Sequence, residues 1–438
     1  MTMQDLHGHT LSGASAQALD AFEIALHELR CLSGDPLGHA EAAVAAAPEF
    51  TMAHALRAWL FLVGTDAGAV PLAREALAQA RTLPADAREA RHLAAIGHWC
   101  AGRWRLAART LEDLSLEHPH DLLALQLGQQ LDFFTGDQRL LRDRIARALP
   151  AWSPDMPGYH ALLGMYAFGL EENGDFHNAE RYGRRAIELE PRDAWAQHAV
   201  VHVLEMQGRR DDGIRWMTGQ AGWKQCGLLA VHNWWHLALH YLGLDDVDAA
   251  LQLLDGPIDG HRPTLALELI DVSALLWRLR LRGVDVGERW VSVAERWSAC
   301  AGHGWYAFND LHAAMAFACA GRADLLEQLD ATQRAAQTRA DDNAGFLLAV
   351  GRAATEAVIA HVAGDHRRTV ERLRDLRSHA RAFGGSDAQR DLLDQTLIHS
   401  ARASGQPALA RGLEAERSLL ARQRAGARPA VALQSAVH

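Results

Sequence analysis

A glycine recurs at nearly constant spacing along the whole of this 438-residue chain. The first three intervals are 34 residues each, and the later ones run from 34 to 43 residues. A period of this length predicts an array of helix–turn–helix units, each packed only against its neighbours. The eleven positions are Gly34, Gly68, Gly102, Gly136, Gly174, Gly208, Gly243, Gly283, Gly321, Gly364 and Gly405.

The residues that follow these glycines repeat as well. A glycine suits the left-handed end of a first helix, an alanine lets two helices approach closely, and a proline ends the second helix. The pattern predicts an all-α, tetratricopeptide-like α-solenoid or superhelix of about eleven degenerate helical pairs. An aromatic residue, an alanine and a proline stand at the same offsets in two units: Trp104, Ala107 and Pro119 after Gly102, and Phe176, Ala179 and Pro191 after Gly174.

The helical pattern also predicts how the chain is organised. We expect residues 1–15 to be a disordered leader, 16–421 a single helical-repeat array, and 422–438 a flexible tail. Proline and glycine predict a break between two sub-arrays near 150–157 and a second loop at 255–260.

Composition narrows the class of partner. The formal net charge is −10, whereas nucleic acids and anionic membranes require a basic face. Five cysteines without a CxxC pair indicate reduced thiols. The N-terminus lacks the pattern of a signal peptide, and no apolar run approaches the roughly 20 residues of a membrane helix. The sequence therefore predicts a cytoplasmic protein that binds neither nucleic acid nor membrane.

Histidine is unusually frequent, with 24 residues, and two helical stripes of it stand in neighbouring units. Residues three or four apart project from one face of a helix, and equivalent helices of adjacent repeats lie side by side. Both stripes precede the glycine of their unit, which places them on first helices. One stripe holds His198, His202 and Glu205, and the other holds His232, His236 and His240.

Three interpretations of these stripes remain open. Imidazoles one helical turn apart can hold a divalent metal such as zinc, here through His198, His202, His232 and His236. The same rings with Glu205 can form a metal-free acid/base or ligand pocket, in which all five residues are catalytic candidates. They can also form a hydrogen-bonded structural seam.

Further polar residues stand where a repeat helix is normally apolar, and these are candidate ligand-binding residues. Among them, Asp271, Asn309, Asp310 and Arg390 are expected on the other walls of the cavity that the two stripes line. Arg390 and Asp391 also fit a buried structural ion pair, which is the favoured interpretation of that pair alone. The candidates are Asp271, Asn309, Asp310, His312, Gln389, Arg390, Asp391 and His399.

These segments resemble the tetratricopeptide repeat protein 38 family, from about the third repeat onward. The resemblance implies a degenerate tetratricopeptide-type superhelix and a cytosolic protein, and it implies no reaction. The family pattern matches every candidate above except His240, where a tyrosine is expected. In ordinary tetratricopeptide proteins the first helices line the concave groove, so by resemblance His198, His202 and Glu205 face inward. The segments are Gly164–Gly174, Asp193–Glu205, His232–His236, Phe308–His312 and Ser386–Asp391.

The mixed polar set favours a closed pocket for a small polar molecule over a protein or peptide groove, which needs repeated Lys, Arg or Asn along one face. The main hypothesis is therefore a small-molecule-binding protein with a His/Glu/Asp-rich concave pocket. Such a protein can be an enzyme of hydrolase or lyase type that uses histidine acid/base chemistry or a histidine-bound metal. The alternative is a non-catalytic tetratricopeptide-type protein-interaction scaffold. A homo-oligomer is compatible with either.

Overall fold

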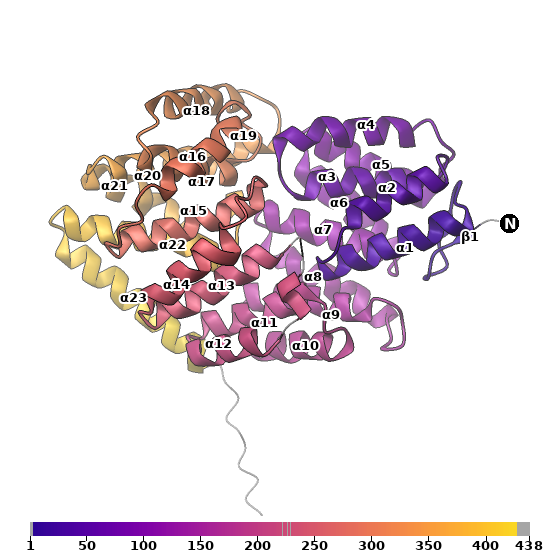
Figure 1. Ribbon diagram of the computed structural model, residues 1–438, viewed down its shortest axis with the longest axis horizontal. Coiled ribbons are helices and arrows are strands. Elements are labelled where there is room, and N and C mark those ends of the chain that lie inside the picture. Colours follow the sequence, from indigo (N-terminus) through magenta and orange to yellow (C-terminus); the bar gives the residue numbers. More distant parts are fainter. Residues whose placement is uncertain (1–2, 221, 226, 228, 427–438) are drawn as a thin grey trace, which may run out of the picture.

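The computed structural model describes residues 3–220, 222–225, 227 and 229–426 (Figure 1). Within these residues the helices form eleven consecutive pairs, from α1/α2 to α22/α23, with α19 and α20 joined into one helix by a π-helical segment. The predicted all-α, tetratricopeptide-like solenoid is confirmed.

The helices of the first six pairs have these bounds: α1 (Ala16–Cys31), α2 (Pro36–Ala46), α3 (Thr51–Val63), α4 (Val70–Ala80), α5 (Ala87–Cys100), α6 (Trp104–Glu117), α7 (Leu122–Phe134), α8 (Gln138–Ala148), α9 (Tyr159–Glu172), α10 (Phe176–Leu189), α11 (Ala194–Met206) and α12 (Arg210–Gly219).

The remaining helices are α13 (Ala230–Gly243), α14 (Val247–Leu253), α15 (Ala266–Leu281), α16 (Arg289–Trp297), α17 (Ala307–Cys319), α18 (Ala323–Ala336), α19 (Asp342–Phe346), α20 (Arg352–Val362), α21 (His366–Leu376), α22 (Asp387–Ala403) and α23 (Pro407–Gly426). Short 3-10 or π segments are η1 (Ala67–Ala69), η2 (Leu149–Ala151), η3 (Gly222–Gln225), η4 (Leu254–Ile258), η5 (Ser298–Gly302), η6 (Leu347–Gly351) and η7 (Arg377–Phe383).

The recurring glycines end the first helix of each pair. Nine of the eleven have a positive φ, the left-handed conformation that glycine adopts without strain. The exceptions are Gly68 and Gly243, and at both turns a neighbour takes the left-handed conformation instead: Thr65 at φ 55° and Asp245 at φ 60°. The spacing of the glycines therefore marks the turns even where another residue bends the chain.

The N-terminal segment differs from the predicted disordered leader. Strands β1 (Met3–Gln4) and β2 (Thr10–Leu11) pair antiparallel, and Leu11 is only 2% exposed. The backbone N–H of Ser12 also donates to Glu89. The segment is ordered because it buries an apolar side chain and anchors its backbone on α5.

The other predicted boundaries can be placed as follows. A loop does follow η2, but α8 packs on α9, so the array continues through residues 150–157. At 255–260 the chain leaves α14 through the short segment η4, which is kinked at Gly256 and ends in a turn. Helix α23 continues to Gly426, so residues 422–426 of the predicted tail are helical, and residues 427–438 lie outside the described part.

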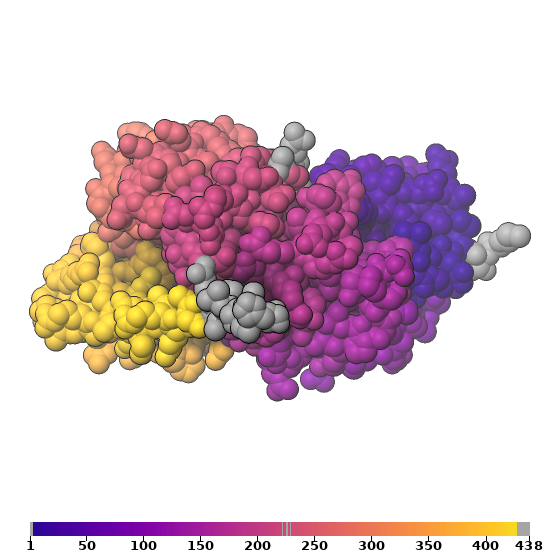
Figure 2. All heavy atoms as spheres, turned by 90° about the horizontal axis from the view of Figure 1, so that it is seen from below, coloured from indigo at the N-terminus to yellow at the C-terminus, as the bar shows by residue number. Residues whose placement is uncertain are grey.

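The superhelix curls until its early repeats contact its late ones. The backbone N–H of Asp342 donates to the carbonyl of Gly102 at 3.0 Å, and the Tyr306 hydroxyl donates to the carbonyl of Phe134 at 3.0 Å. Helix α23 returns to the middle of the chain, where Gln207 donates to the carbonyl of Arg424 at 3.2 Å. Figure 2 shows the yellow C-terminal region beside the magenta middle. Helices α11 and α13 lie in that middle region (Figure 1).

Among the described residues, one helical span, Asp342–Val362, is long and apolar enough to cross a membrane, with a mean hydropathy of 1.3 over its most apolar stretch, 56% of it buried. This differs from the expectation that no such apolar run exists. The α20 part of the span packs against α17 and α21, and Arg352 within it pairs with Asp330. A core helix of the repeat array meets the same length and hydropathy criteria.

Candidate metal centre

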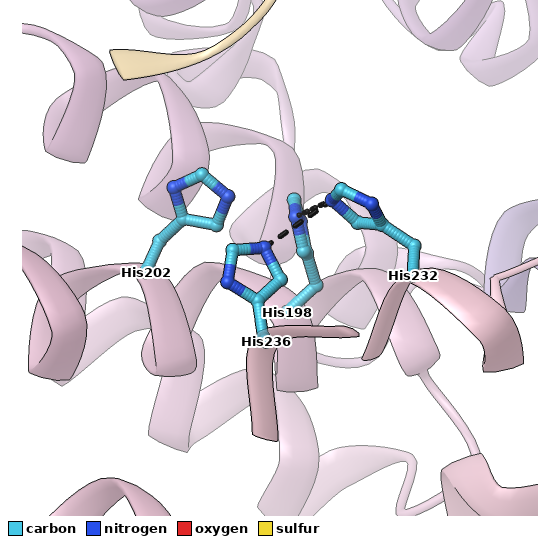
Figure 3. Close-up of side chains that lie close together, drawn as sticks. All are labelled: His198, His202, His232 and His236. Atoms are coloured by element: carbon cyan, nitrogen blue, oxygen red, sulfur yellow. Dashed lines mark hydrogen bonds between the residues drawn. The ribbon is translucent and has the colours of Figure 1, made fainter. Parts of the chain in front are cut away.

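Four histidine rings meet between the first helices of the sixth and seventh pairs (Figure 3). Each offers one ring nitrogen, and these nitrogens all lie within 4.8 Å of one another. The side chain of His232 is 16% exposed, and the other three are buried. We call His198 and His202 of α11, with His232 and His236 of α13, the four-histidine centre.

Two carboxylates hold rings of this centre from outside. Asp271 Oδ1 of α15 lies 2.8 Å from His232 Nδ1, and Glu205 Oε2 of α11 lies 2.8 Å from His236 Nδ1. A carboxylate that is ionised only accepts, and Nδ1 then carries the proton in both rings and Nε2 carries a lone pair. This is the outer arrangement that fixes the tautomer of metal-binding histidines.

The two lone pairs face each other. Nε2 of His232 lies 3.2 Å from Nε2 of His236 and 3.0 Å from Nε2 of His198. His198 can donate to His232, because Nδ1 of His198 has no partner among the residues that the structure describes and its proton can reside on Nε2. His232 and His236 cannot donate to each other through Nε2 in the neutral state. With both carboxylates ionised, a proton or a metal ion between these rings satisfies the contact.

A pair of buried carboxyls adjoins His202. Glu171 Oε2 lies 3.4 Å from His202 Nδ1, without the geometry of a hydrogen bond, and neither ring nitrogen of His202 has a hydrogen-bond partner in the described part of the chain. Glu171 and Glu172, at the end of α9, are 2% and 4% exposed. With His202 they form a second group of potential metal ligands that shares this ring.

Burial keeps the interior of this region neutral. It lowers the pKa of His202 to about 4 and, together with the neighbouring rings, holds the pKa of His198 and His236 well below the ordinary value. Burial and the nearby Glu171 raise the pKa of Glu172 to about 8. Neutral imidazole is the form that coordinates a metal.

A cavity of about 390 Å³ lies beside the centre, under α23. Glu205 lines it and also contacts His236, so the cavity reaches the outer shell of the centre. Both carboxylates and arginines line this cavity, and the apolar Leu420 of α23 is also part of its wall. The six arginines are Arg210, Arg377, Arg381, Arg390, Arg417 and Arg424, and the other acidic residues are Asp387, Asp391 and Asp394.

Of the residues predicted on the other walls, Asp271 joins the centre and Arg390 lines the adjoining cavity, as does the further candidate Asp391. The expected Arg390–Asp391 pair does not form. Arg390 pairs with Asp387 at 2.6 Å, and Asp391 pairs with Arg417. Adjacent residues on a helix point about 100° apart, so each meets a different partner.

Asn309 and Asp310 have partners elsewhere. Asn309 donates to the carbonyl of Thr65 at 3.1 Å. Asp310 accepts from Gln333 at 3.2 Å, and burial raises its pKa to about 7. Both fix helix packing at the point where the array curls.

His312, Gln389, His399 and His240 also lie outside the four-histidine centre. His312 Nδ1 donates to the carbonyl of Phe308 at 2.9 Å, and Gln389 forms a capping box at the start of α22. His399 groups with two histidines far from α11, described below. His240 is buried against Gly213, so the stripe on α13 leaves the centre after His236.

Sequence reasoning missed Glu171, Glu172, His361 and His366 as candidates. A signal for Glu171 was present, since it stands three residues before Gly174 just as Glu205 stands three before Gly208. Equivalent positions of consecutive repeats lie on the same side of the solenoid.

No protein-family profile matches the chain. Solved structures that resemble it include a human IFIT1 dimer with m7Gppp-AAAA, and Naa15/Naa10 bound to HypK-THB. The first is 13% identical, with a TM-score of 0.41, and the match covers 92% of this chain and 95% of the other. The second is 12% identical, with a TM-score of 0.25, and the match covers 92% of this chain and 64% of the other. The paired helices described above make the chain a tetratricopeptide-like helical-repeat protein.

The partner prediction is corrected by this comparison. We expected a small polar molecule rather than a protein, and no nucleic acid, whereas the partners in these structures are m7Gppp-AAAA and HypK-THB. The net charge of −10 is an average over the chain and does not describe a local surface, as the arginines around one cavity show.

Proposed function

We propose that this chain is a non-catalytic helical-repeat scaffold for a protein partner, and that a divalent transition metal in the four-histidine centre locks its middle repeats. The observation that carries the metal is the 3.2 Å contact between Nε2 of His232 and Nε2 of His236, while a carboxylate engages the Nδ1 of each ring.

A metal ion fits this contact better than a proton. Protonating one ring places a charge where burial disfavours it, as the lowered pKa of His236 indicates. A tetrahedral zinc with Zn–N bonds of about 2.0–2.1 Å separates its ligand nitrogens by about 3.3 Å. The separations of 3.0 and 3.2 Å are close to that value. Asp271 and Glu205 supply negative charge to offset the cation.

The closed ligand set favours a structural role. Catalytic zinc sites use three protein ligands and keep a position for water, whereas structural sites use four. Here four rings converge, three of them buried. A metal here therefore ties α11 to α13 and stabilises the concave side, which supports the scaffold over the hydrolase or lyase hypothesis.

The surface near α23 supports a protein partner. Leu419 and Leu420 are 50% and 49% exposed, and Leu420 borders the cavity of alternating arginines and carboxylates. Apolar residues rimmed by charges of both signs suit a protein surface. The resemblance to the tetratricopeptide repeat protein 38 family, and with it a cytoplasmic location, stays part of this proposal.

The metal is tested by loading the purified protein with zinc, dialysing it against EDTA and measuring the metal by mass spectrometry. We expect one chelator-resistant zinc per chain, lost in the double variant His232→Ala/His236→Ala. His177→Ala, at an exposed position of α10, is the control and retains it. The proposal fails if the unaltered protein holds no resistant zinc, or if the double variant holds as much.

The scaffold is tested by crosslinking and mass spectrometry with Leu419→Asp/Leu420→Asp. We expect a protein that crosslinks to α23 in the unaltered chain to be lost from this variant. Leu116→Asp, on α6 and 56% exposed, is the matched control. Crosslinks that do not depend on α23 would refute this partner surface.

A further inference from the structure

A second histidine cluster lies at the far end of the array from the N-terminus, where α20, α21 and α22 meet (Figure 1). His361 stands near the end of α20, His366 begins α21, and His399 is on α22. One ring nitrogen of each lies within 4.8 Å of the others. The ring centroids are 5.1–5.9 Å apart, so the three rings surround one point.

Hydrogen bonding inside the protein does not account for this cluster. Nδ1 of His366 and Nδ1 of His399 are buried and have no hydrogen-bond partner among the described residues. A buried polar atom without a partner is costly, so two of them beside a third ring call for a ligand. His361 differs, because its Nδ1 lies 2.9 Å from Ser400 Oγ. If the Ser400 hydroxyl accepts that proton, Nε2 of His361 is free to coordinate.

We propose that His361, His366 and His399 form a second metal site that binds a divalent transition metal and leaves a coordination position to solvent. Imidazole nitrogens suit zinc, cobalt, nickel and copper. Three protein ligands with an open position are the arrangement of reactive rather than structural zinc sites. The site goes beyond the proposed scaffold function and shares no ligand with the four-histidine centre.

The two sites differ in exposure and in surrounding charge. His366 and His399 are half-buried, so a metal can enter and leave from solvent. The described contacts of the three rings include no carboxylate, and Arg280 and Arg402 lie near enough to act on them electrostatically. A cation therefore binds here more weakly and exchanges faster than between Asp271 and Glu205.

Titration with Co²⁺, followed by visible absorption, tests the site in the full chain. We expect two equivalents in the unaltered protein, one of which EDTA removes quickly. His366→Ala and His399→Ala each replace a half-buried ring, and each weakens the fast-exchanging equivalent by at least about tenfold. His379→Ala, an exposed histidine on η7, is the control and keeps both equivalents. Azide added to the cobalt protein shifts the spectrum of the fast-exchanging site, because it displaces the bound solvent.

The outcomes separate this site from the four-histidine centre. Loss of only the fast-exchanging equivalent in His366→Ala and His399→Ala supports the second site, whatever the result for the His232→Ala/His236→Ala variant. Unchanged Co²⁺ binding in both single variants, with thermal unfolding like that of the unaltered protein, overturns it. An azide-insensitive spectrum overturns the open position.

Discussion

Asn309 of α17 donates through Nδ2 to the backbone carbonyl of Thr65 at 3.1 Å, across 244 residues of sequence. Thr65 is the residue with positive φ that ends the first helix of the second pair, and it is fully buried. The contact joins the second repeat to the ninth. It explains why a polar side chain stands in an otherwise apolar helix: Asn309 closes the curl of the superhelix.

Asn309→Ala is expected to lower the free energy of unfolding by about 1–3 kcal/mol, because the buried carbonyl of Thr65 loses its donor. Urea unfolding followed by circular dichroism measures the change. Asn178→Ala, which removes only a local bond to Asp175 on the surface of α10, is the comparison and should cost less. Equal decreases in the free energy of unfolding in the two variants would argue against a role of Asn309 in joining the second repeat to the ninth.

Gly136→Ala should destabilise the protein more than Gly174→Ala. Both glycines have positive φ, so each substitution carries a conformational cost of about 1 kcal/mol. A Cβ at Gly136 would also lie 1.8 Å from the carbonyl oxygen of Arg381, whereas one at Gly174 meets nothing within 4 Å. Thermal unfolding of the two variants checks this, and similar melting temperatures would show that the contact with η7 yields easily.

Glu205→Gln and Asp271→Asn should each weaken zinc binding at the four-histidine centre by about 10–100-fold without removing a ligand, because they orient the rings and offset the cation. Competition with a zinc chelator of known affinity measures the effect. Glu188→Gln, whose side chain is 63% exposed on α10, is the control. Wild-type affinity in both outer-shell variants would contradict the arrangement proposed here.

Asp310 should make stability depend on pH. Burial raises its pKa in the fold to about 7 from the ordinary 3.8, so the folded state binds its proton more tightly than the unfolded state. The contribution of Asp310 to the free energy of unfolding is therefore greatest below about pH 4 and is lost as the pH rises to about 7. The difference of about 3 between the two pKa values corresponds to at most about 4 kcal/mol.

Asp310→Asn removes that dependence. The free energy of unfolding of this variant minus that of the unaltered protein should therefore increase from pH 5 to pH 8. Urea unfolding at both pH values measures the increase. Asp113→Asn, an exposed position on α6, should show none. A relative stability of Asp310→Asn that does not change with pH would mean that Asp310 is ionised in the fold.

The structure brings some of the candidate residues together and separates others. The stripes at His198 and His232 meet because they occupy first helices of adjacent repeats, and neighbouring helices are set by order along the chain. His399 was a candidate ligand-binding residue with no predicted place beside these stripes, and it meets His361 and His366. The sequence predicts that His399 lies on a helix. Which side chains contact it depends on how the repeats pack in the superhelix.

The sequence by itself determined the repeat, the turns and the face of each helix on which a polar residue lies. These properties are local, because glycine spacing sets the turns and helical periodicity sets the direction of each side chain. Only the tertiary structure decided that Asn309 meets Thr65, that α23 returns to α11, and that His240 turns away toward Gly213. Such contacts depend on the small rotation between successive repeats, which adds up over the array and leaves no local pattern in the sequence.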